Sequence, residues 1–350
     1  MSQHSPQLES TLTRAWLKRG PLACALWPVS LLFGGLGSLR RGLYRAGILK
    51  SARLPVRVVV IGNVFIGGTG KTPLTIWLVQ ALRAAGMHPG VISRGHGSAD
   101  RLPRPVTAAS TPQQVGDEPL LIFQRGACPV MVGRDRAAAG RALLDLHPEV
   151  DVLLTDDGLQ HYALQRDVEI VLFDGRGVGN GWLLPAGPLR EPPRRRRDVT
   201  VINTPHLESA LAATVAPRGG LVVPMQLAGG VAERLADRTE RRPLAELANR
   251  GQRIVAAAGI GNPQRFFTML RAAGLSFAEL PLPDHHDFLD QPFAALDAGL
   301  ILITEKDAVK CAQIEYLKDD PRLWVVPVSA HIDNALAQQI VEKCRGRSTA

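Results

Sequence analysis

Apolar runs separated by Gly- and Pro-rich breaks predict a fold of alternating strands and helices. Short runs of Val, Leu and Ile are typical of strands buried on both faces; they begin at Val56 and recur at residues 90–93, 129–132, 152–155, 169–173 and 199–203. Helical spacing separates several of them, most clearly at residues 134–146. This alternation predicts an α/β fold with a mostly parallel sheet and right-handed crossovers.

A second α/β unit follows a Gly-, Pro- and Arg-rich passage at residues 175–197. Its strands are expected near residues 254–258, 300–303 and 324–328, and its helices near residues 264–273 and 335–343. We therefore expect three parts along the chain: an N-terminal segment at residues 1–50, a first lobe at residues 51–204 and a C-terminal α/β lobe at residues 205–350.

The N-terminal segment holds an uncharged apolar stretch, residues 21–39, that is about as long as a membrane-spanning helix. Pro28 near its centre and the glycines behind it weaken a straight helix. We expect a hairpin or broken helix that lies in the membrane interface, with a spanning helix and a helix buried against the body as alternatives. A cleaved signal peptide fits poorly, because arginines follow the apolar stretch.

The formal net charge of +9 suggests a nucleic-acid binder at first, but its distribution favours a membrane surface. Residues 1–57 contain nine Arg and Lys residues against the single acid Glu9, so the rest of the chain is close to neutral. The four cysteines lie far apart without metal-ligand spacing, which favours a reducing cytosol and argues against a structural zinc site.

The motif GGTGKT at residues 67–72 predicts a phosphate-binding loop between the first strand and an amphipathic helix. Glycines allow backbone N–H groups to converge on an anion, and the following helix presents its positive end. Lys71 is expected to reach the β- and γ-phosphates and Thr72 to bind Mg²⁺. Phe65 stands where the full Walker A pattern has its first glycine. The residues expected to bind the nucleotide are Phe65, Ile66, Gly67, Gly68, Thr69, Gly70, Lys71 and Thr72.

Two acidic motifs lie at the ends of predicted elements. Asp156 and Asp157 follow an apolar strand, where a Walker B carboxylate would orient Mg²⁺; the structural alternative is an Asp-Gly turn. Asp157 is the preferred ligand of the two. Asp117 in GDEP is either a helix-capping residue or the base that accepts a proton from an attacking hydroxyl group.

Two loops supply candidate partners for these acids. His285 and His286 are adjacent in DHHD, where a histidine could orient an acidic base, although a solvent-facing loop histidine is the plain alternative. Arg190 and Glu191 lie in a Pro-rich loop, in which a rigid Arg190 could clamp a phosphate. The arginine run at residues 194–197 is either a solvated face or a contact for an acidic substrate or a membrane.

Eight ordered motifs resemble the signature of the tetraacyldisaccharide 4'-kinase family: GNVFIGGTGKTP, SRGHG, VGDEP, TDDGLQH, GNGWLLPAGPLREP, AAAGIGNP, PDHH and LITEKDAVK. The resemblance implies an ATP-dependent kinase that transfers the γ-phosphoryl group to the 4'-hydroxyl of a tetraacyl glucosamine disaccharide 1-phosphate in lipid A biosynthesis. It also implies a P-loop α/β/α kinase lobe and a smaller α/β/α lobe, joined by a short two-stranded linker.

The same resemblance implies roles for individual residues. It makes Asp117 the general base and His285 its partner, and it places Lys71 and Arg190 among the catalytic groups. ATP and Mg²⁺ are the implied cofactors. The residues implied around Mg²⁺ are Thr72, Asp156, Asp157 and Glu191.

An acceptor that carries four acyl chains has to be met at a bilayer. The expected location is therefore the cytoplasmic face of the inner membrane, as a peripheral or monotopic protein, with no nucleic acid and no obligate protein partner. The alternative is a nucleotide-switched ATPase that acts on a protein partner, because GGxGKT loops also occur in that class. Such ATPases carry an additional lysine where this chain has Ile66.

Overall fold

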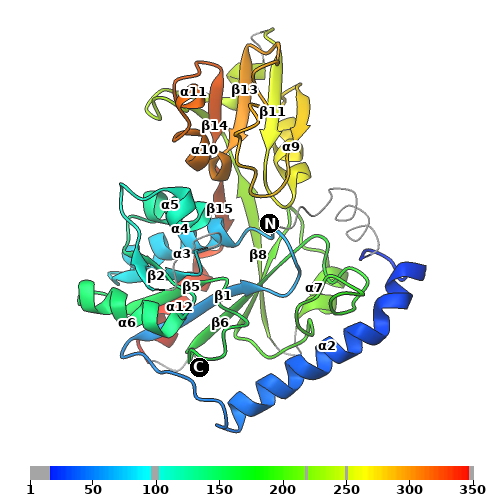
Figure 1. Ribbon diagram of the computed structural model, residues 1–350, viewed down its shortest axis with the longest axis vertical. Helices are drawn as coiled ribbons and strands as arrows, with labels where there is room; N and C mark the ends of the chain where they lie inside the picture. Colours follow the sequence, from blue (N-terminus) through cyan, green and yellow to red (C-terminus); the bar gives the residue numbers. More distant parts are fainter. Residues whose placement is uncertain (1–15, 96–101, 217–219, 249–250, 347–350) are drawn as a thin grey trace.

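The computed structural model describes residues 16–95, 102–216, 220–248 and 251–346, which form two stacked lobes and one long N-terminal helix (Figure 1). Residues 1–15 of the predicted N-terminal segment lie outside the described residues. The larger lobe carries both the N-terminal helix and the last helix of the chain, and the smaller lobe is formed by a segment of the chain between them.

A nine-stranded sheet forms the centre of the larger lobe. Its inner strands are parallel, as predicted, whereas the two edge strands run antiparallel to their neighbours. In spatial order the strands are β15 (Ser329–Ile332), β8 (Leu221–Ala228), β7 (Val199–Asn203), β6 (Val168–Asp174), β1 (Arg57–Asn63), β5 (Val152–Asp156), β2 (Pro89–Ser93), β4 (Val130–Val132) and β3 (Arg104–Pro105).

Strand β1 is apolar at every position of its centre because helices cover both faces of the sheet. Val59 and Ile61 belong to one core cluster, and Val58 and Val60 belong to the other. The first cluster is covered by α3 (Lys71–Ala84), α5 (Asp117–Gly126) and α12 (Asn334–Cys344), with the short α4 (Pro112–Val115) beside α5. The second cluster is covered by α6 (Arg136–Leu146) and α7 (Ser209–Val215).

A six-stranded sheet forms the smaller lobe and is likewise covered on both faces. Phe266, Phe267 and Leu270 of α9 (Pro263–Ala272) are buried against one face. The other face packs against α10 (Glu305–Cys311) and α11 (Glu315–Lys318). The strands in spatial order are β10 (Arg241–Pro243), β9 (Val231–Arg234), β14 (Leu323–Val326), β13 (Leu300–Thr304), β11 (Ile254–Ala258) and β12 (Ala278–Pro281), and α8 (Leu244–Ala248) follows β10.

The predicted lobe boundary at residue 204 needs correction, because the chain crosses between the lobes twice. Helix α7 and strand β8 still belong to the larger lobe, and β15 and α12 return to it after the smaller lobe is complete. Leu336 and Ile340 of α12 are fully buried in the core beside α3, which is the physical reason for the return. The antiparallel pair of β8 and β15 connects the two lobes.

Strand β8 tolerates Pro224, a residue that lacks a backbone N–H donor. At this position β8 pairs with β7 on one side, and its pairing with β15 on the other side begins only at Met225. The missing donor therefore faces the unpaired side of the strand.

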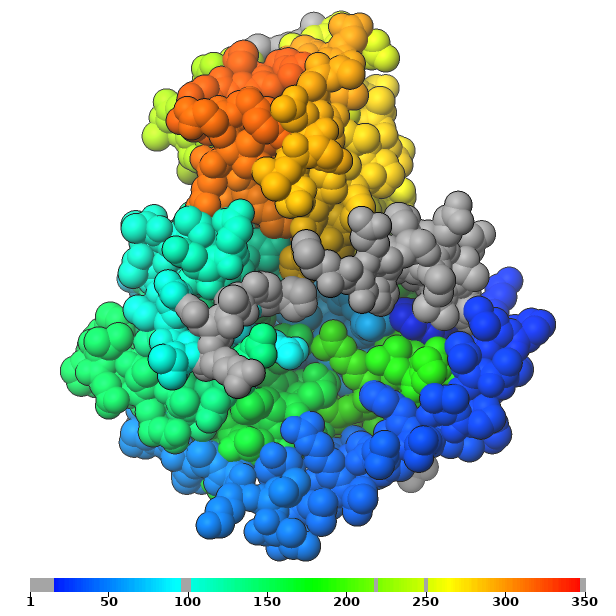
Figure 2. Space-filling model, in the orientation of Figure 1, coloured from blue at the N-terminus to red at the C-terminus, as the bar shows by residue number. Residues whose placement is uncertain are grey.

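Helix α2 (Pro21–Arg45) is continuous over 25 residues, so the expected break at Pro28 is wrong. Ala23 and Ser30 are buried against the larger lobe, and the Ser30 hydroxyl donates a hydrogen bond to the carbonyl of Leu183. The most apolar part of the helix has a mean hydropathy of 1.7, yet only 11% of it is buried. Figure 2 shows the helix, in dark blue, along the flank of the larger lobe. Its exposed apolar side chains are Leu22, Trp27, Val29, Leu31, Leu32, Phe33, Leu36 and Leu39.

Ile340→Ala is expected to destabilise the larger lobe by about 2–5 kcal/mol, because it removes buried methyl groups and leaves a cavity beside α3. Urea unfolding measures the loss, and amide hydrogen exchange localises it to α3 and α12. The exposed Gln338→Ala on the same helix is the control. Loss of amide protection in α9 instead of α3 would mean that α12 packs against the smaller lobe.

Candidate active site

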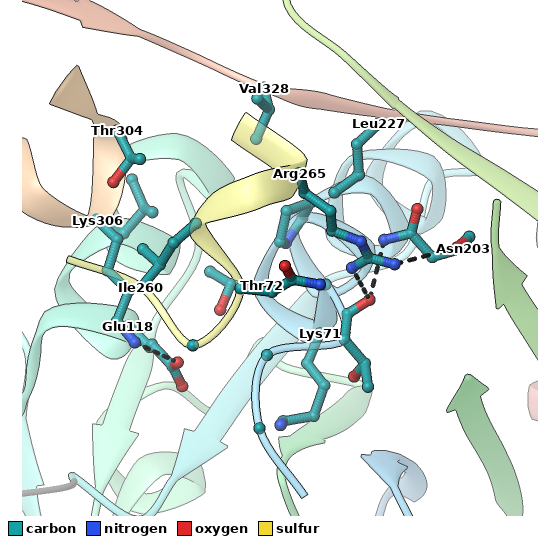
Figure 3. A pocket seen from close by; sticks show the side chains of 18 of the residues that line it. Lys71, Thr72, Glu118, Asn203, Leu227, Ile260, Arg265, Thr304, Lys306 and Val328 are labelled. Carbon is teal, nitrogen blue, oxygen red and sulfur yellow. Dashed lines mark hydrogen bonds and ion pairs between the residues drawn. The ribbon is translucent and has the colours of Figure 1, made fainter. Parts of the chain in front are cut away.

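A cavity of about 1300 Å³ lies between the two lobes. This volume exceeds the roughly 300–1,000 Å³ that is usual for one small ligand, so the cavity has room for two substrates. The larger lobe lines it with residues 67–73 and Asp156, and the smaller lobe lines it with residues 260–262 and Lys306. Figure 3 shows side chains from both lobes facing the same space.

The phosphate loop joins β1 to α3 and directs the start of the helix into the cavity. Gly70 precedes α3 with φ 102°, a left-handed conformation that favours glycine. A Cβ atom at Gly70 would lie 2.6 Å from Asn203 Nδ2, so this position also needs the absence of a side chain. Residues 67–72 therefore form the anion-binding helix start that the motif predicted.

Phe65 and Ile66 do not line the cavity, so the predicted nucleotide-binding set is too long by two residues. The N–H of Ile66 donates to the carbonyl of Pro188 at 2.9 Å, which removes it from phosphate binding. Phe65 is buried beneath the guanidinium of Arg176, whose carbon lies 4.3 Å from the ring centroid. These two residues hold the phosphate loop against Pro188 and Arg176 and do not face the cavity.

Lys71, Asp157 and Arg190 meet at the wall of the cavity, as expected of a common site. Lys71 Nζ lies 3.7 Å from Asp157 Oδ1 and donates to Asn63 Oδ1 at 3.3 Å. Arg190 Nη1 lies 3.3 Å from Asp157 Oδ2. Burial acts to raise the pKa of Asp157, but the charges of Lys71 and Arg190 outweigh it and lower the pKa below the usual range.

Asp156 ends β5 and is buried, and neither of its carboxylate oxygens has a hydrogen-bond partner among the described residues. Burial and the nearby charge of Glu118 raise the pKa of this carboxyl group. An unpaired buried carboxylate is costly unless a cation compensates it. Thr72 and Asp157 line the same cavity, and such oxygen ligands are those that Mg²⁺ prefers. These three residues therefore fit a Mg²⁺ ion.

Glu191 does not belong to this set, which corrects the prediction. It does not line the cavity, and its Oε2 accepts a hydrogen bond of 2.6 Å from the Tyr162 hydroxyl. The same oxygen lies 3.4 Å from Arg195 Nε and 3.6 Å from Arg41 Nη1. Because Arg41 belongs to α2, Glu191 ties the loop that carries Arg190 to the N-terminal helix.

Asp117, the first residue of α5, faces a cluster of cationic side chains from the smaller lobe. Its Oδ2 lies 3.0 Å from His285 Nδ1, 3.2 Å from Lys310 Nζ and 3.9 Å from Lys306 Nζ. Its Oδ1 accepts the N–H of Glu118 at 3.0 Å. The N-cap of α5 is Gly116 and no side chain caps the helix, so the capping alternative for Asp117 is wrong. The other oxygen of Asp117 meets the histidine that was predicted as its partner.

The Asp117 carboxylate and the His285 imidazolium each stabilise the charged form of the other. Burial acts to raise the pKa of Asp117, but the hydrogen bond from His285 and the charges of Lys306 and Lys310 hold it well below the usual range. The hydrogen bond to Asp117 raises the pKa of His285 against the opposing effect of burial. At neutral pH the Asp117 carboxyl group is therefore ionised, so its oxygens carry no proton.

Lys306 and Lys310 were missed by the sequence analysis, although both lie in the motif LITEKDAVK. The available signal was their spacing of four residues on a helix that directly follows the buried strand β13, which places them on one face. His286 points elsewhere: it groups with Asp287 and Asp290 on a largely exposed loop, where their ligand atoms lie within 4.8 Å of one another. His96 of the motif SRGHG lies outside the described residues.

Another wall of the cavity is strongly cationic. Arg40 of α2, Arg94, Arg134 and Arg136 all line it. Arg136 is buried and donates to the carbonyl of Gly133 at 2.7 Å; burial lowers its pKa to about 10, so it stays charged at neutral pH. This wall suits an anionic group of a second substrate.

Comparison with known proteins gives a consistent picture. The family model described as tetraacyldisaccharide-1-P 4'-kinase (LpxK) matches residues 22–345. The tetraacyldisaccharide 4'-kinase of Janthinobacterium sp. (strain Marseille) is 61% identical over 354 residues, covering 100% of both chains, and that of Herminiimonas arsenicoxydans is 58% identical over 98% of both. A crystal structure of LpxK from Aquifex aeolicus in complex with ATP superposes with a TM-score of 0.75 at 26% identity, covering 92% of this chain and 99% of that one.

Asp117→Asn is expected to lower the pKa of His285, because the hydrogen bond to the carboxylate is the main cause of its elevation. NMR titration of the imidazole signals measures this pKa. In the wild type the stabilisation from the raised His285 pKa is complete below the pKa of the unfolded histidine and disappears as pH rises through the folded value. An unchanged His285 titration would mean that the pair does not form in solution.

Proposed function

The chain belongs to the tetraacyldisaccharide-1-phosphate 4'-kinase family, and from this premise we propose how its residues perform the reaction. The protein is an ATP-dependent kinase that transfers the γ-phosphoryl group to the 4'-hydroxyl of a tetraacyl disaccharide 1-phosphate in lipid A biosynthesis. The comparisons do not support the alternative of a nucleotide-switched ATPase. One observation carries the mechanism: the phosphate loop and the pair of Asp117 and His285 line one cavity.

ATP binds with its phosphates at residues 67–72. Lys71 neutralises the β- and γ-phosphates, and the start of α3 contributes N–H donors and its positive end. Leu227, Ile260 and Val328 give the cavity an apolar part that suits the adenine ring (Figure 3).

Thr72, Asp156 and Asp157 would hold Mg²⁺, with Asp157 as the primary carboxylate. The ion would neutralise negative charge that develops on the phosphates. The support for this proposal is the unpaired carboxylate of Asp156 beside the phosphate loop. Arg190, which is 28% exposed and contacts Asp157, is placed to exchange that contact for a phosphate oxygen.

Asp117 is the general base. Its Oδ2 accepts the proton of the 4'-hydroxyl as the oxygen bonds to the γ-phosphorus and the bond from that phosphorus to the bridging oxygen of ADP breaks. His285 orients the carboxylate, and the lysines of α10 keep it ionised. The cationic wall formed by Arg40, Arg94, Arg134 and Arg136 receives the 1-phosphate of the acceptor.

The protein works at the cytoplasmic face of the inner membrane as a peripheral or monotopic protein. Support comes from α2, which exposes eight large apolar side chains and also places Arg40 in the cavity wall. A lipid whose acyl chains stay in the bilayer could then present its polar part to the site. We expect no nucleic acid and no obligate protein partner.

Asp117→Ala is expected to reduce phosphoryl transfer by about 10²–10⁴-fold while ATP still binds, because it removes the base and leaves the phosphate loop intact. The assay incubates the protein with γ-labelled ATP, Mg²⁺ and the disaccharide 1-phosphate in detergent and follows label in the lipid. The exposed Asp145→Ala is the control. Absence of labelled lipid with the wild-type protein would refute the kinase function. Full activity of Asp117→Ala would mean that Asp117 is not the general base.

The double variant Leu32→Glu and Leu36→Glu is expected to move the protein from membranes to the supernatant, because both side chains are about 60% exposed and each would place a charge in the bilayer. Co-sedimentation with anionic vesicles measures the partition. Leu146→Glu, on α6 with 60% exposure, should leave it unchanged. Equal vesicle binding by the double variant and the wild type would mean that α2 is not the membrane contact.

A further inference from the structure

A single backbone carbonyl of the phosphate loop is held from two lobes at once. The carbonyl of Thr69 accepts a hydrogen bond of 2.9 Å from Asn203 Nδ2 of the larger lobe. It also accepts one of 3.2 Å from Arg265 Nη1, which belongs to α9 of the smaller lobe. Figure 3 shows Asn203 and Arg265 converging beside the loop that leads to Lys71.

Arg265 is itself fixed by two further acceptors. Its Nη2 donates to the carbonyl of Asn203 at 3.1 Å and lies 3.5 Å from Asp174 Oδ2. Asp174 is 1% exposed and also holds Arg176, whose Nη2 donates to the carbonyl of Gly68 at 3.4 Å. Two successive carbonyls of the loop are thus bound by arginines that share one buried carboxylate.

These contacts determine where the N–H groups of the loop point. In a trans peptide the carbonyl and the following N–H point in opposite directions. Fixing the carbonyls of Gly68 and Thr69 therefore turns the N–H groups of Thr69 and Gly70 the other way. Convergent N–H groups are what a phosphate loop uses to bind its anion.

The smaller lobe also touches the loop directly. A Cβ atom built on Gly261 would lie 2.9 Å from the backbone nitrogen of Gly68, so the segment before α9 approaches the loop as closely as a glycine allows. Arg265 and Gly261 thus contact the loop from the same side of the lobe boundary.

We propose that Arg265 is a positioning residue for ATP binding, which orients the phosphate loop through the carbonyl of Thr69 and so makes the nucleotide site depend on the smaller lobe. Its guanidinium bridges the carbonyls of Thr69 and Asn203, a two-point contact that a lysine cannot reproduce. The proposal deepens the nucleotide-binding part of the proposed function. It is independent of the identity of the phosphate acceptor.

The test measures ATP affinity in the absence of any lipid, by calorimetry, with Arg265→Ala, Arg265→Lys and Arg271→Ala. Arg265→Ala should raise the dissociation constant for ATP about tenfold, the loss of one charge-assisted hydrogen bond. Arg265→Lys should fall between that variant and the wild type. Arg271 lies on the same helix but pairs with Glu279 within the smaller lobe, so Arg271→Ala should bind ATP normally.

Thermal unfolding separates positioning from simple structural support. The proposal predicts that Arg265→Ala reduces the ATP-induced rise in unfolding temperature, and that in turnover assays it raises KM for ATP without raising KM for the lipid. If Arg265→Ala does not fold, Arg265→Lys gives the same comparison. Wild-type ATP affinity in a folded Arg265 variant, or an equal loss in Arg271→Ala, would overturn the proposal. Because this readout needs no phosphoryl transfer, it stands or fails separately from the kinase assignment.

Discussion

The structure depends on the neutralisation of one buried carboxylate across the boundary between the lobes. Asp117 is only 3% exposed, and the cations that compensate it within the described residues, from His285, Lys306 and Lys310, belong to the smaller lobe. Separating the lobes would remove these three cations from the carboxylate and open it to water. The packing of α5 against α10, supported by the ion pair of Arg125 and Glu305, is therefore inseparable from the formation of the catalytic base.

Sheet topology explains why the other functional groups lie beside that carboxylate. In parallel sheets, loops at the carboxyl ends of the strands meet at one edge. Asp156 ends β5, Asn203 ends β7 and the phosphate loop follows β1, so the larger lobe brings phosphate and metal ligands together. The smaller lobe does the same with Lys306 after β13 and residues 260–262 after β11. The cavity is the space between two such edges, and each lobe alone would supply only half of the site.

The sequence predicted what local patterns determine. Buried strands such as β5 and β7, the loop at residues 67–72 and the two lobes follow from apolar runs and glycine spacing, and their α/β architecture is confirmed. It could not predict that α12 returns to the larger lobe, because its apolar face fits either core. The family resemblance placed Glu191 at the metal, and only the tertiary structure shows it bonded to Tyr162 instead. Nothing in the local sequence distinguishes Lys306 and Lys310 from lysines on a protein surface. They act on the site through their contacts with Asp117, which lies 189 residues or more before them in the chain.

In the intact protein the smaller lobe holds the Asp117 carboxylate ionised. Carbon-13 NMR titration of selectively labelled aspartate carboxyl groups, with Asp117→Asn to assign the signal, tests it most directly. We expect the Asp117 signal to stay that of a carboxylate at every pH at which the protein remains folded, and Lys310→Met to raise the pKa of Asp117. A wild-type pKa of Asp117 within or above the usual aspartate range of about 3.5–4 would mean that the smaller lobe does not stabilise its ionised form.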